Sequence, residues 1–109
     1  MKLVISIVHS DDADSLVRSL QQKGHRCTKI GTTGGFLREG NATILIGTEA
    51  AQVDDVLDII KENCHSRTQF ISPMPPLVEA GELYIPKPVE VQLGGATVFV
   101  VDVERAEKF

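Results

Sequence analysis

The chain has no excess of positive charge: 11 Lys and Arg stand against 15 Asp and Glu, giving a formal net charge of −4 at pH 7. Binding to duplex nucleic acid depends on a basic face that neutralises phosphates, so this composition argues against it. No apolar run approaches the roughly 20 residues that a membrane span needs. The apolar start, residues 1–8, has no small-residue cleavage site and leads into acidic residues, unlike a signal peptide. We therefore expect a cytoplasmic protein with no membrane span and no polymeric nucleic acid as partner.

Cysteine is scarce, and the histidines are scattered. Cys27 and Cys64 match no metal-binding spacing, and two thiols in a chain of this size fit a reducing compartment. The three histidines, His9, His25 and His65, stand in neither HxH nor HxxxH spacing. No Walker or GxGxxG phosphate loop occurs, and no orienting residue accompanies a cysteine–histidine dyad. These absences predict a protein that is not an enzyme and that holds no metal or cofactor.

The hydrophobic pattern predicts one domain over residues 1–109. Apolar residues on both faces of residues 2–9 indicate a central strand. Helical spacing of apolar residues follows, with Ser10 as the N-cap and Gly24 as the stop. Helices are expected at 11–23 and about 50–63, and strands at 25–31, 43–48, 68–71, 89–93 and 96–103.

Proline is confined to one stretch: all five prolines fall within residues 73–88, which excludes a helix or a central strand there. A long exposed loop is expected at about 68–88, and Gly94-Gly95 after it predicts a two-residue hairpin turn. The order indicates an α+β, ferredoxin-like (βαββαβ) sandwich with an extra C-terminal hairpin strand. Two helices cover only one face of such a sheet. Because the strands are apolar on both faces, we expect an oligomer whose sheets face inward.

The most informative motif is TTGGFLREGN at residues 32–41, between two predicted strands. Its glycines let the backbone approach a ligand closely, and its N–H groups can form an anion-binding nest. Phe36 offers a ring for stacking, and Asn41 offers both a donor and an acceptor. This composition indicates a loop that wraps a ligand.

The neighbouring strands add polar groups to this loop. Arg26 and Thr28 share one strand face by the period of two, and Arg26 can fork onto a phosphate. Gly47 lies inside a predicted strand, where glycine often marks the close approach of a ligand. From the residues alone, we expect a small, planar, anionic ligand.

Several blocks of the sequence resemble one known family. They are RCTK at 26–29, TTGGFLREGN at 32–41, and PVEV at 88–91 with GGATVFV at 94–100. Over nearly its whole length the chain resembles the PII-like cyclic di-AMP receptor family. The resemblance implies a homotrimer of ferredoxin-like subunits that binds cyclic di-AMP, and no other cofactor, in clefts between neighbouring subunits. It also implies loops that reorder on binding and modulate a protein partner, whose identity the sequence does not give.

The resemblance implies these ligand contacts: Arg26, Thr28, Thr33, Gly34, Gly35, Phe36, Leu37, Asn41, Gly47 and Phe99. Gly35, Phe36 and Leu37 would wrap one adenine, and Phe99 would line the cleft from the terminal strand. The chain departs from the family pattern at Gly24, where asparagine is expected, and at Lys108, where glutamine is expected. Each lost polar contact would cost about 0.5–1.5 kcal/mol, which leaves the ligand preference open.

Two alternative functions use the same residues. A PII-like regulator could bind ATP or another adenine nucleotide in a similar cleft, and competition between ATP and cyclic di-AMP separates the two. A ligand-free trimeric interaction module would instead dock a protein through its surface and the proline-rich loop. The glycine loop argues against that module, because a purely structural trimer has no need of it.

Overall fold

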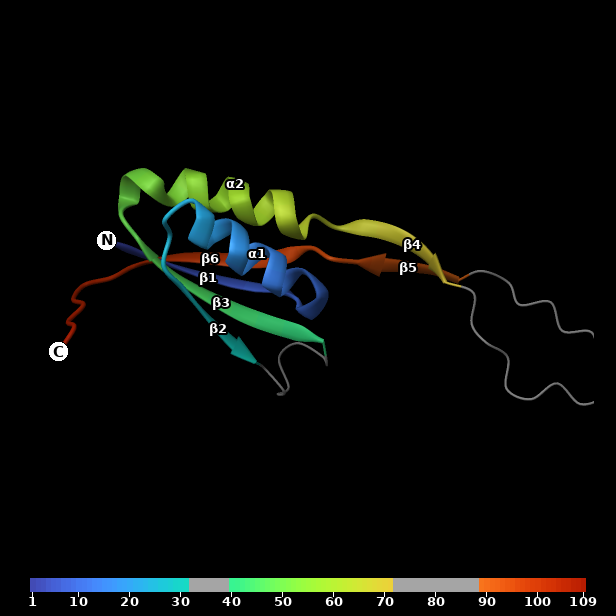
Figure 1. Ribbon diagram of the computed structural model, residues 1–109, viewed down its shortest axis with the longest axis horizontal. Helices are drawn as coiled ribbons and strands as arrows, with labels where there is room; N and C mark the ends of the chain where they lie inside the picture. The colour runs from blue at the N-terminus through green and yellow to red at the C-terminus, as the bar shows by residue number, and fades with distance from the viewer. Residues whose placement is uncertain (32–39, 72–88) are drawn as a thin grey trace, which may run out of the picture.

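The computed structural model describes residues 1–31, 40–71 and 89–109 (Figure 1). The predicted contacts Thr33, Gly34, Gly35, Phe36 and Leu37 lie outside the described residues, as does the proline-rich stretch from 72 to 88. In chain order the elements are β1 (Lys2–His9), α1 (Ser10–Gln22), β2 (Cys27–Gly31), β3 (Asn41–Thr48), the short 3₁₀ helix η1 (Ala50–Gln52), α2 (Val53–Cys64), β4 (Arg67–Ile71), β5 (Val89–Leu93) and β6 (Ala96–Asp102).

Four strands form one antiparallel sheet in the order β2-β3-β1-β6. Both helices lie on the same face of this sheet (Figure 1). The strand order and connectivity are compatible with the ferredoxin-like plan, with β6 as the last strand. The expected α+β class and the central position of β1 are confirmed.

The remaining two strands, β4 and β5, form a separate two-stranded sheet, which we call the arm. Its register runs from Arg67 opposite Leu93 to Ile71 opposite Val89. The arm continues beyond the end of α2 and away from the four-stranded sheet (Figure 1). The strand predicted at 68–71 is thus confirmed, and the loop expected at about 68–88 cannot begin before residue 72.

The expected hairpin through Gly94-Gly95 is wrong. β5 pairs with β4 and β6 pairs with β1, so the two glycines join strands of different sheets. Their φ angles are +77° and +87°, the backbone region that glycine tolerates best. The two glycines indicate only a local turn. β6 instead pairs with β1, and this pairing packs Val98 against the core.

The first helix begins and ends through specific caps. Its N-cap is His9, whose Nδ1 accepts the Asp11 N–H at 3.2 Å, so the expected Ser10 cap is wrong by one residue. At the other end, Gly24 has φ +83° and its N–H donates to Gln21 O. The next amide, of His25, donates to Leu20 O, which completes a Schellman motif. The glycine stop is thus confirmed.

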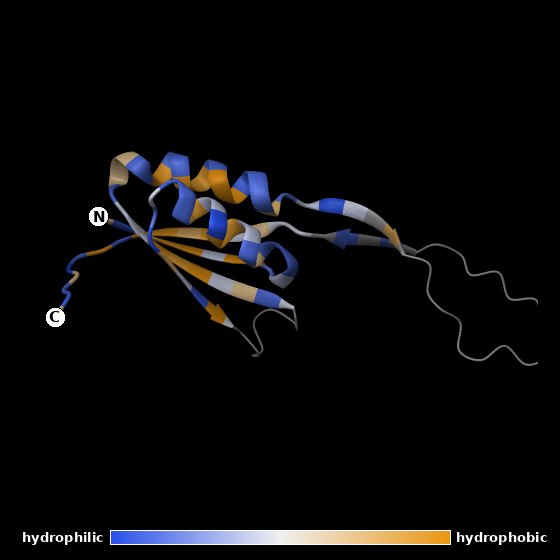
Figure 2. Cartoon of the chain, in the orientation of Figure 1, coloured by the Kyte–Doolittle hydropathy of each residue, from blue (hydrophilic) through white to orange (hydrophobic). Residues whose placement is uncertain are grey.

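The core lies between the two helices and the face of the sheet that they cover. Figure 2 shows apolar residues along the strands and in bands on both helices. The buried apolar side chains are Val4, Val8, Ala13, Leu16, Leu20, Ala42, Ile44, Ile46, Val56, Ile59, Ile60 and Cys64. The apolar residues that recur every 3.6 positions in the helices and every two positions in the strands thus pack into one contiguous core.

Candidate functional site on the open face of the sheet

The face of the sheet away from the helices carries apolar side chains together with threonine hydroxyls. The strand register places Thr28, Leu45, Ile5 and Phe99 in one row across it. The neighbouring rows contain Ile30, Thr43, Ile7 and Thr97 on one side and Gly47, Leu3 and Val101 on the other. Asp, Glu, Lys and Arg are absent from these rows. We call these three rows the open face.

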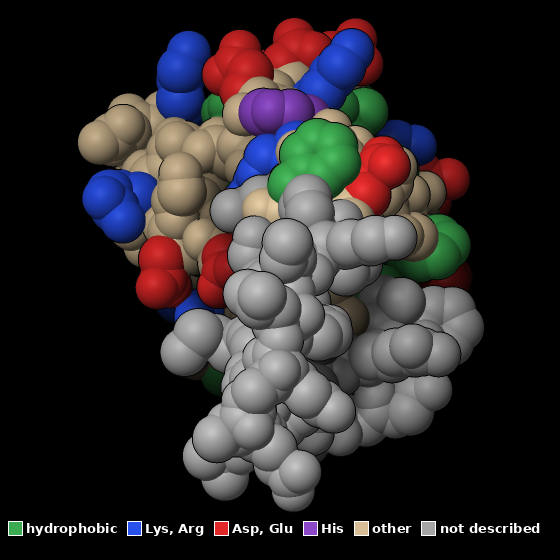
Figure 3. All heavy atoms as spheres, turned by 90° about the vertical axis from the view of Figure 1, so that its right-hand side faces the viewer, with side chains coloured by type: hydrophobic (Ala, Val, Ile, Leu, Met, Phe, Trp, Pro, Cys, Tyr) green, Lys and Arg blue, Asp and Glu red, His purple; other side chains and the backbone are tan. Residues whose placement is uncertain are grey.

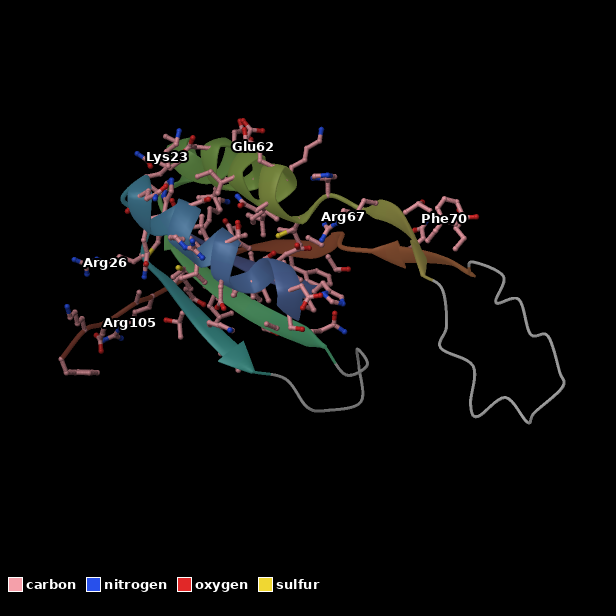
Figure 4. All side chains as sticks on the ribbon, turned by 45° about the vertical axis from the view of Figure 1, so that its right-hand side comes forward. Lys23, Arg26, Glu62, Arg67, Phe70 and Arg105 are labelled. Carbon is pink, nitrogen blue, oxygen red and sulfur yellow. The ribbon has the colours of Figure 1, made fainter. Side chains whose placement is uncertain are left out.

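Arg26 and Gly47 lie together at one end of the open face. They line a pocket of about 250 Å³ with Met1, Gly24, His25, Thr48, Glu49 and Gln52. Arg26 stands one residue before β2, so the strand expected from His25 begins two residues later. Figure 4 shows Arg26 pointing away from the helices, at the opposite end of the body from Arg67. Arg26 makes no ion pair with any residue in the part of the chain that the structure describes.

A buried histidine supports this pocket from behind. The His25 side chain is only 5% exposed, and its Nε2 lies 2.7 Å from Asp55 Oδ2 on α2. This contact fastens the segment that carries Arg26 to the second helix. The position of Arg26 therefore depends on a tertiary contact between residues 30 positions apart.

Asn41 lies at the other end of the open face. It lines a pocket of about 260 Å³ with Ile7, His9, Gly94, Gly95, Ala96 and Thr97. Asn41 and Gly47 are six residues apart on β3, which corresponds to about 20 Å of extended strand. The sequence did not assign His9 or Thr97 to the ligand site, because only the strand pairing brings them beside Asn41.

Phe99 belongs to a different edge of the sheet from Arg26 and Thr28. It lies on β6, whereas Thr28 lies on β2, with β3 and β1 between them. Three strand spacings separate the two edges, about 14 Å. The Phe99 side chain is 48% exposed. Those predicted contacts that the structure describes are therefore distributed along the open face and do not line a single pocket within one chain.

Cys27 faces the helices, on the opposite side of β2 from Thr28. It packs against the core. Burial raises the pKa of its thiol, so the neighbouring Arg26 does not activate it. The Cys27 thiol therefore does not belong to the open face, where the described candidate residues offer hydroxyl, amide, guanidinium and apolar groups.

Within residues 1–31, 40–71 and 89–109, no three His, Cys, Asp or Glu side chains gather as a metal site would require. In the same ranges, no helix is both long and apolar enough to cross a membrane. Figure 3 views the molecule from the end of the arm and shows acidic and basic side chains interspersed on the coloured surface. The described surface there does not gather charge of one sign.

Comparison with known proteins gives this arrangement a context. The sequence profile of the cyclic-di-AMP receptor family matches residues 1–109. The chain belongs to the cyclic-di-AMP receptor family. The suspected resemblance is thereby confirmed over the whole sequence.

A solved structure supports the fold of this cyclic-di-AMP receptor family member. It is described as the crystal structure of a functionally unknown protein from Pediococcus pentosaceus ATCC 25745. The two chains are 42% identical and superpose with a TM-score of 0.76. The match covers 99% of this chain and 96% of the other. The likeness therefore includes both the four-stranded sheet and the arm.

Proposed function

We propose that this protein is a homotrimeric, cytoplasmic receptor that binds cyclic di-AMP between neighbouring subunits. In this proposal the ligand changes the order of the loops and of the arm, and thereby the binding of a protein partner. The protein performs no chemistry on the dinucleotide. The family supports the ligand, and the open face supports the place where it binds.

The distribution of predicted contacts over the open face carries this proposal. Arg26 and Gly47 line one pocket at the end of the open face, whereas Phe99 lies on β6, the edge strand on the other side of the sheet, and does not line that pocket. A neighbouring subunit packed on the open face would bring its own edge strand to the Arg26 pocket. The three rows carry no ionisable side chains, which supports such packing. A sheet face that is exposed to solvent normally carries polar residues, whereas a face covered by another surface does not.

The Arg26 pocket has the chemistry for a cyclic dinucleotide. A guanidinium can hold a phosphodiester oxygen through two parallel N–H groups, and the Thr28 hydroxyl adds a further donor. A Cβ added at Gly47 would meet only Met1 Cε, at 3.6 Å, an ordinary contact. The chain's own packing therefore leaves room for a side chain there. We infer that the glycine at this position lets an adenine edge approach the backbone.

The rest of the predicted site comes from the resemblance. Gly35, Phe36 and Leu37 would wrap one adenine, with Thr33, Gly34 and Asn41 beside them. Asn41 connects this loop to the open face, since β3 begins at that residue. The ligand would thus contact both the glycine loop and the sheet.

Isothermal titration calorimetry with cyclic di-AMP tests the proposal, with ATP and cyclic di-GMP as controls and light scattering to measure the oligomer mass. We expect a trimer that binds about one cyclic di-AMP per subunit and binds the controls weakly. Preferential binding of ATP would identify an adenine-nucleotide regulator in place of a second-messenger receptor. A trimer that binds no nucleotide would contradict the receptor function and favour an interaction module.

A further inference from the structure

One buried carboxylate connects the arm to the body, by which we mean the four-stranded sheet and its two helices. Arg67, the first residue of β4, donates from Nη2 to Asp12 Oδ1 at 3.1 Å and from Nη1 to Asp12 Oδ2 at 3.4 Å. The Asp12 side chain is only 9% exposed, whereas that of Arg67 is 40% exposed. Figure 4 shows Arg67 where the chain leaves α2 and enters β4. The first connection of the arm is therefore held by the first turn of α1.

The second connection of the arm closes on the same point. A Cβ added at Gly94 would lie 2.6 Å from His65 O, 2.7 Å from Arg67 Nη1 and 3.3 Å from Asp12 Oδ2. Glycine is thus required at this position by space as well as by its φ of +77°. Both chain segments that lead into the arm pack around the Asp12–Arg67 ion pair.

The same turn of α1 also holds the end of the glycine loop. The Ser10 N–H donates to Gly40 O, directly before β3 begins at Asn41. Gly40 has φ +93°, and a Cβ there would lie 3.6 Å from Ser10 Oγ. His9, which caps this turn, lines the pocket that contains Asn41 and Gly94-Gly95. Two segments far apart in sequence are thus fastened to the same turn, one at Ser10 and the other at Asp12.

The electrostatics favour a stable ion pair. The positive end of the α1 dipole stabilises a carboxylate in the first turn. The hydrogen bond and charge of Asp12 raise the pKa of the Arg67 guanidinium. Removing Arg67 would leave the buried Asp12 carboxylate without its partner, which costs more than the pair itself contributes. Removing the charge of Asp12 would instead release the partly exposed Arg67 side chain from the body, so either change should loosen the connection.

We propose that the first turn of α1 couples the glycine loop to the arm through the Asp12–Arg67 ion pair. A ligand that moves Gly40 and Asn41 then shifts the arm, and a partner that holds the arm changes the glycine loop in return. Asp12 and Arg67 are positioning residues in this device and do not contact the ligand. The identity of the ligand rests on the proposed function, whereas the coupling itself can be measured without ligand.

Hydrogen exchange of the ligand-free protein tests the coupling. Asp12→Asn keeps the size of the side chain and removes its charge. We expect exchange at least tenfold faster for the amides of β4 and β5 and also for the Ser10 amide. The matched control is Asp14→Asn, on the same helix, where an exposed carboxylate pairs with Lys29 at 3.1 Å. The control should change neither region, and an arm that loosens while Ser10 is unaffected would overturn the coupling.

The same variants, with cyclic di-AMP added, separate the coupling from the proposed function. We expect the wild-type protein to bind and to show altered exchange in the arm, and Asp12→Asn to bind within threefold without that change. An arm that still responds in Asp12→Asn would refute the coupling. A wild-type protein that binds no cyclic di-AMP would refute the proposed function alone, because the ligand-free measurement still decides the coupling. If Asp12→Asn does not fold, Arg67→Lys is the alternative variant. It keeps the positive charge but cannot donate two parallel hydrogen bonds to Asp12, and it should give a smaller increase in exchange than the loss of the Asp12 charge.

Discussion

The two faces of the four-stranded sheet differ in what covers them, although the same strands build both. On the helix side Val4, Ile44 and Ile46 are 0% exposed. On the open face Ile5 and Leu45 are only half-buried, and Phe99 is 48% exposed. Both faces carry apolar residues, so hydrophobicity alone does not distinguish them. The helix side is completed within the chain, whereas the open face is left partly exposed.

This difference assigns two roles to neighbouring residues of one strand. Side chains on the helix side should determine whether the chain folds at all. Those on the open face should determine what the folded chain assembles with and binds. The predictions below test that division, beginning with the largest expected effect.

Ile44 and Leu45 are adjacent on β3 and point to opposite faces. Ile44→Ala should lower the free energy of unfolding by about 2–5 kcal/mol, because it leaves a cavity in a closed core. Leu45→Ala should have an effect that depends on protein concentration, because it weakens assembly more than folding. Urea denaturation at two protein concentrations separates these outcomes. Equal, concentration-independent losses for both variants would contradict the division of the two faces.

Phe99→Asp should dissociate the proposed trimer, because it places a charge on the open face where a neighbouring subunit would cover it. Light scattering should then report the mass of a monomer, while the circular dichroism spectrum remains that of a folded protein. Phe70→Asp is the matched control: Phe70 lies on the arm and is 68% exposed. A trimer that survives Phe99→Asp would remove Phe99 from the interface.

The reactivity of the Cys64 thiol tests whether the core on the helix side excludes solvent. Burial, with a smaller effect of the Asp12 charge, raises the pKa of its thiol from 9.0 to about 11. The folded state therefore favours the neutral thiol, and this contribution to stability is lost as the pH rises from about 9 towards 11. At pH 8 the thiolate fraction is roughly a hundredfold below that of an ordinary cysteine. Alkylation of a Cys27→Ser variant should be at least that much slower in the native protein than in urea; equal rates would show an open core.

Arg26→Ala should weaken cyclic di-AMP binding about tenfold to a hundredfold, because a hydrogen bond to a charged group contributes about 1.5–3 kcal/mol. The trimer should remain intact, since Arg26 stands outside the three rows of the open face that a neighbouring subunit would cover. Lys23→Ala removes a nearby exposed cation and should leave the affinity unchanged. Calorimetry on both variants measures the difference, and unchanged binding in Arg26→Ala would remove it from the site.

Local sequence signals predicted the elements well where the signal and the packing agree. The glycine stop at Gly24 and the apolar stripes of both helices are examples, because each depends on contacts within a few residues. The Gly94-Gly95 hairpin failed for the opposite reason. Two adjacent glycines describe a sharp turn, but they do not say which strand the chain will pair with after it.

In the candidate site, too, the sequence predicted some residues and only the packing of the chain brought others together. The sequence singled out Arg26, Asn41 and Gly47, and the structure places all three at the ends of the open face. It did not single out Asp12 or Arg67, which are 55 residues apart and resemble ordinary surface charges in sequence. No periodicity links such residues, since their proximity arises only from the packing of α1 against the base of the arm.

By itself the sequence determined the helices, most strand positions, the family and the kind of ligand expected, because these depend on short-range patterns and specific motifs. Only the tertiary structure decided that β5 leaves the sheet to form an arm. It also decided which polar groups meet at its base, because strand partners and buried ion pairs are selected by long-range packing.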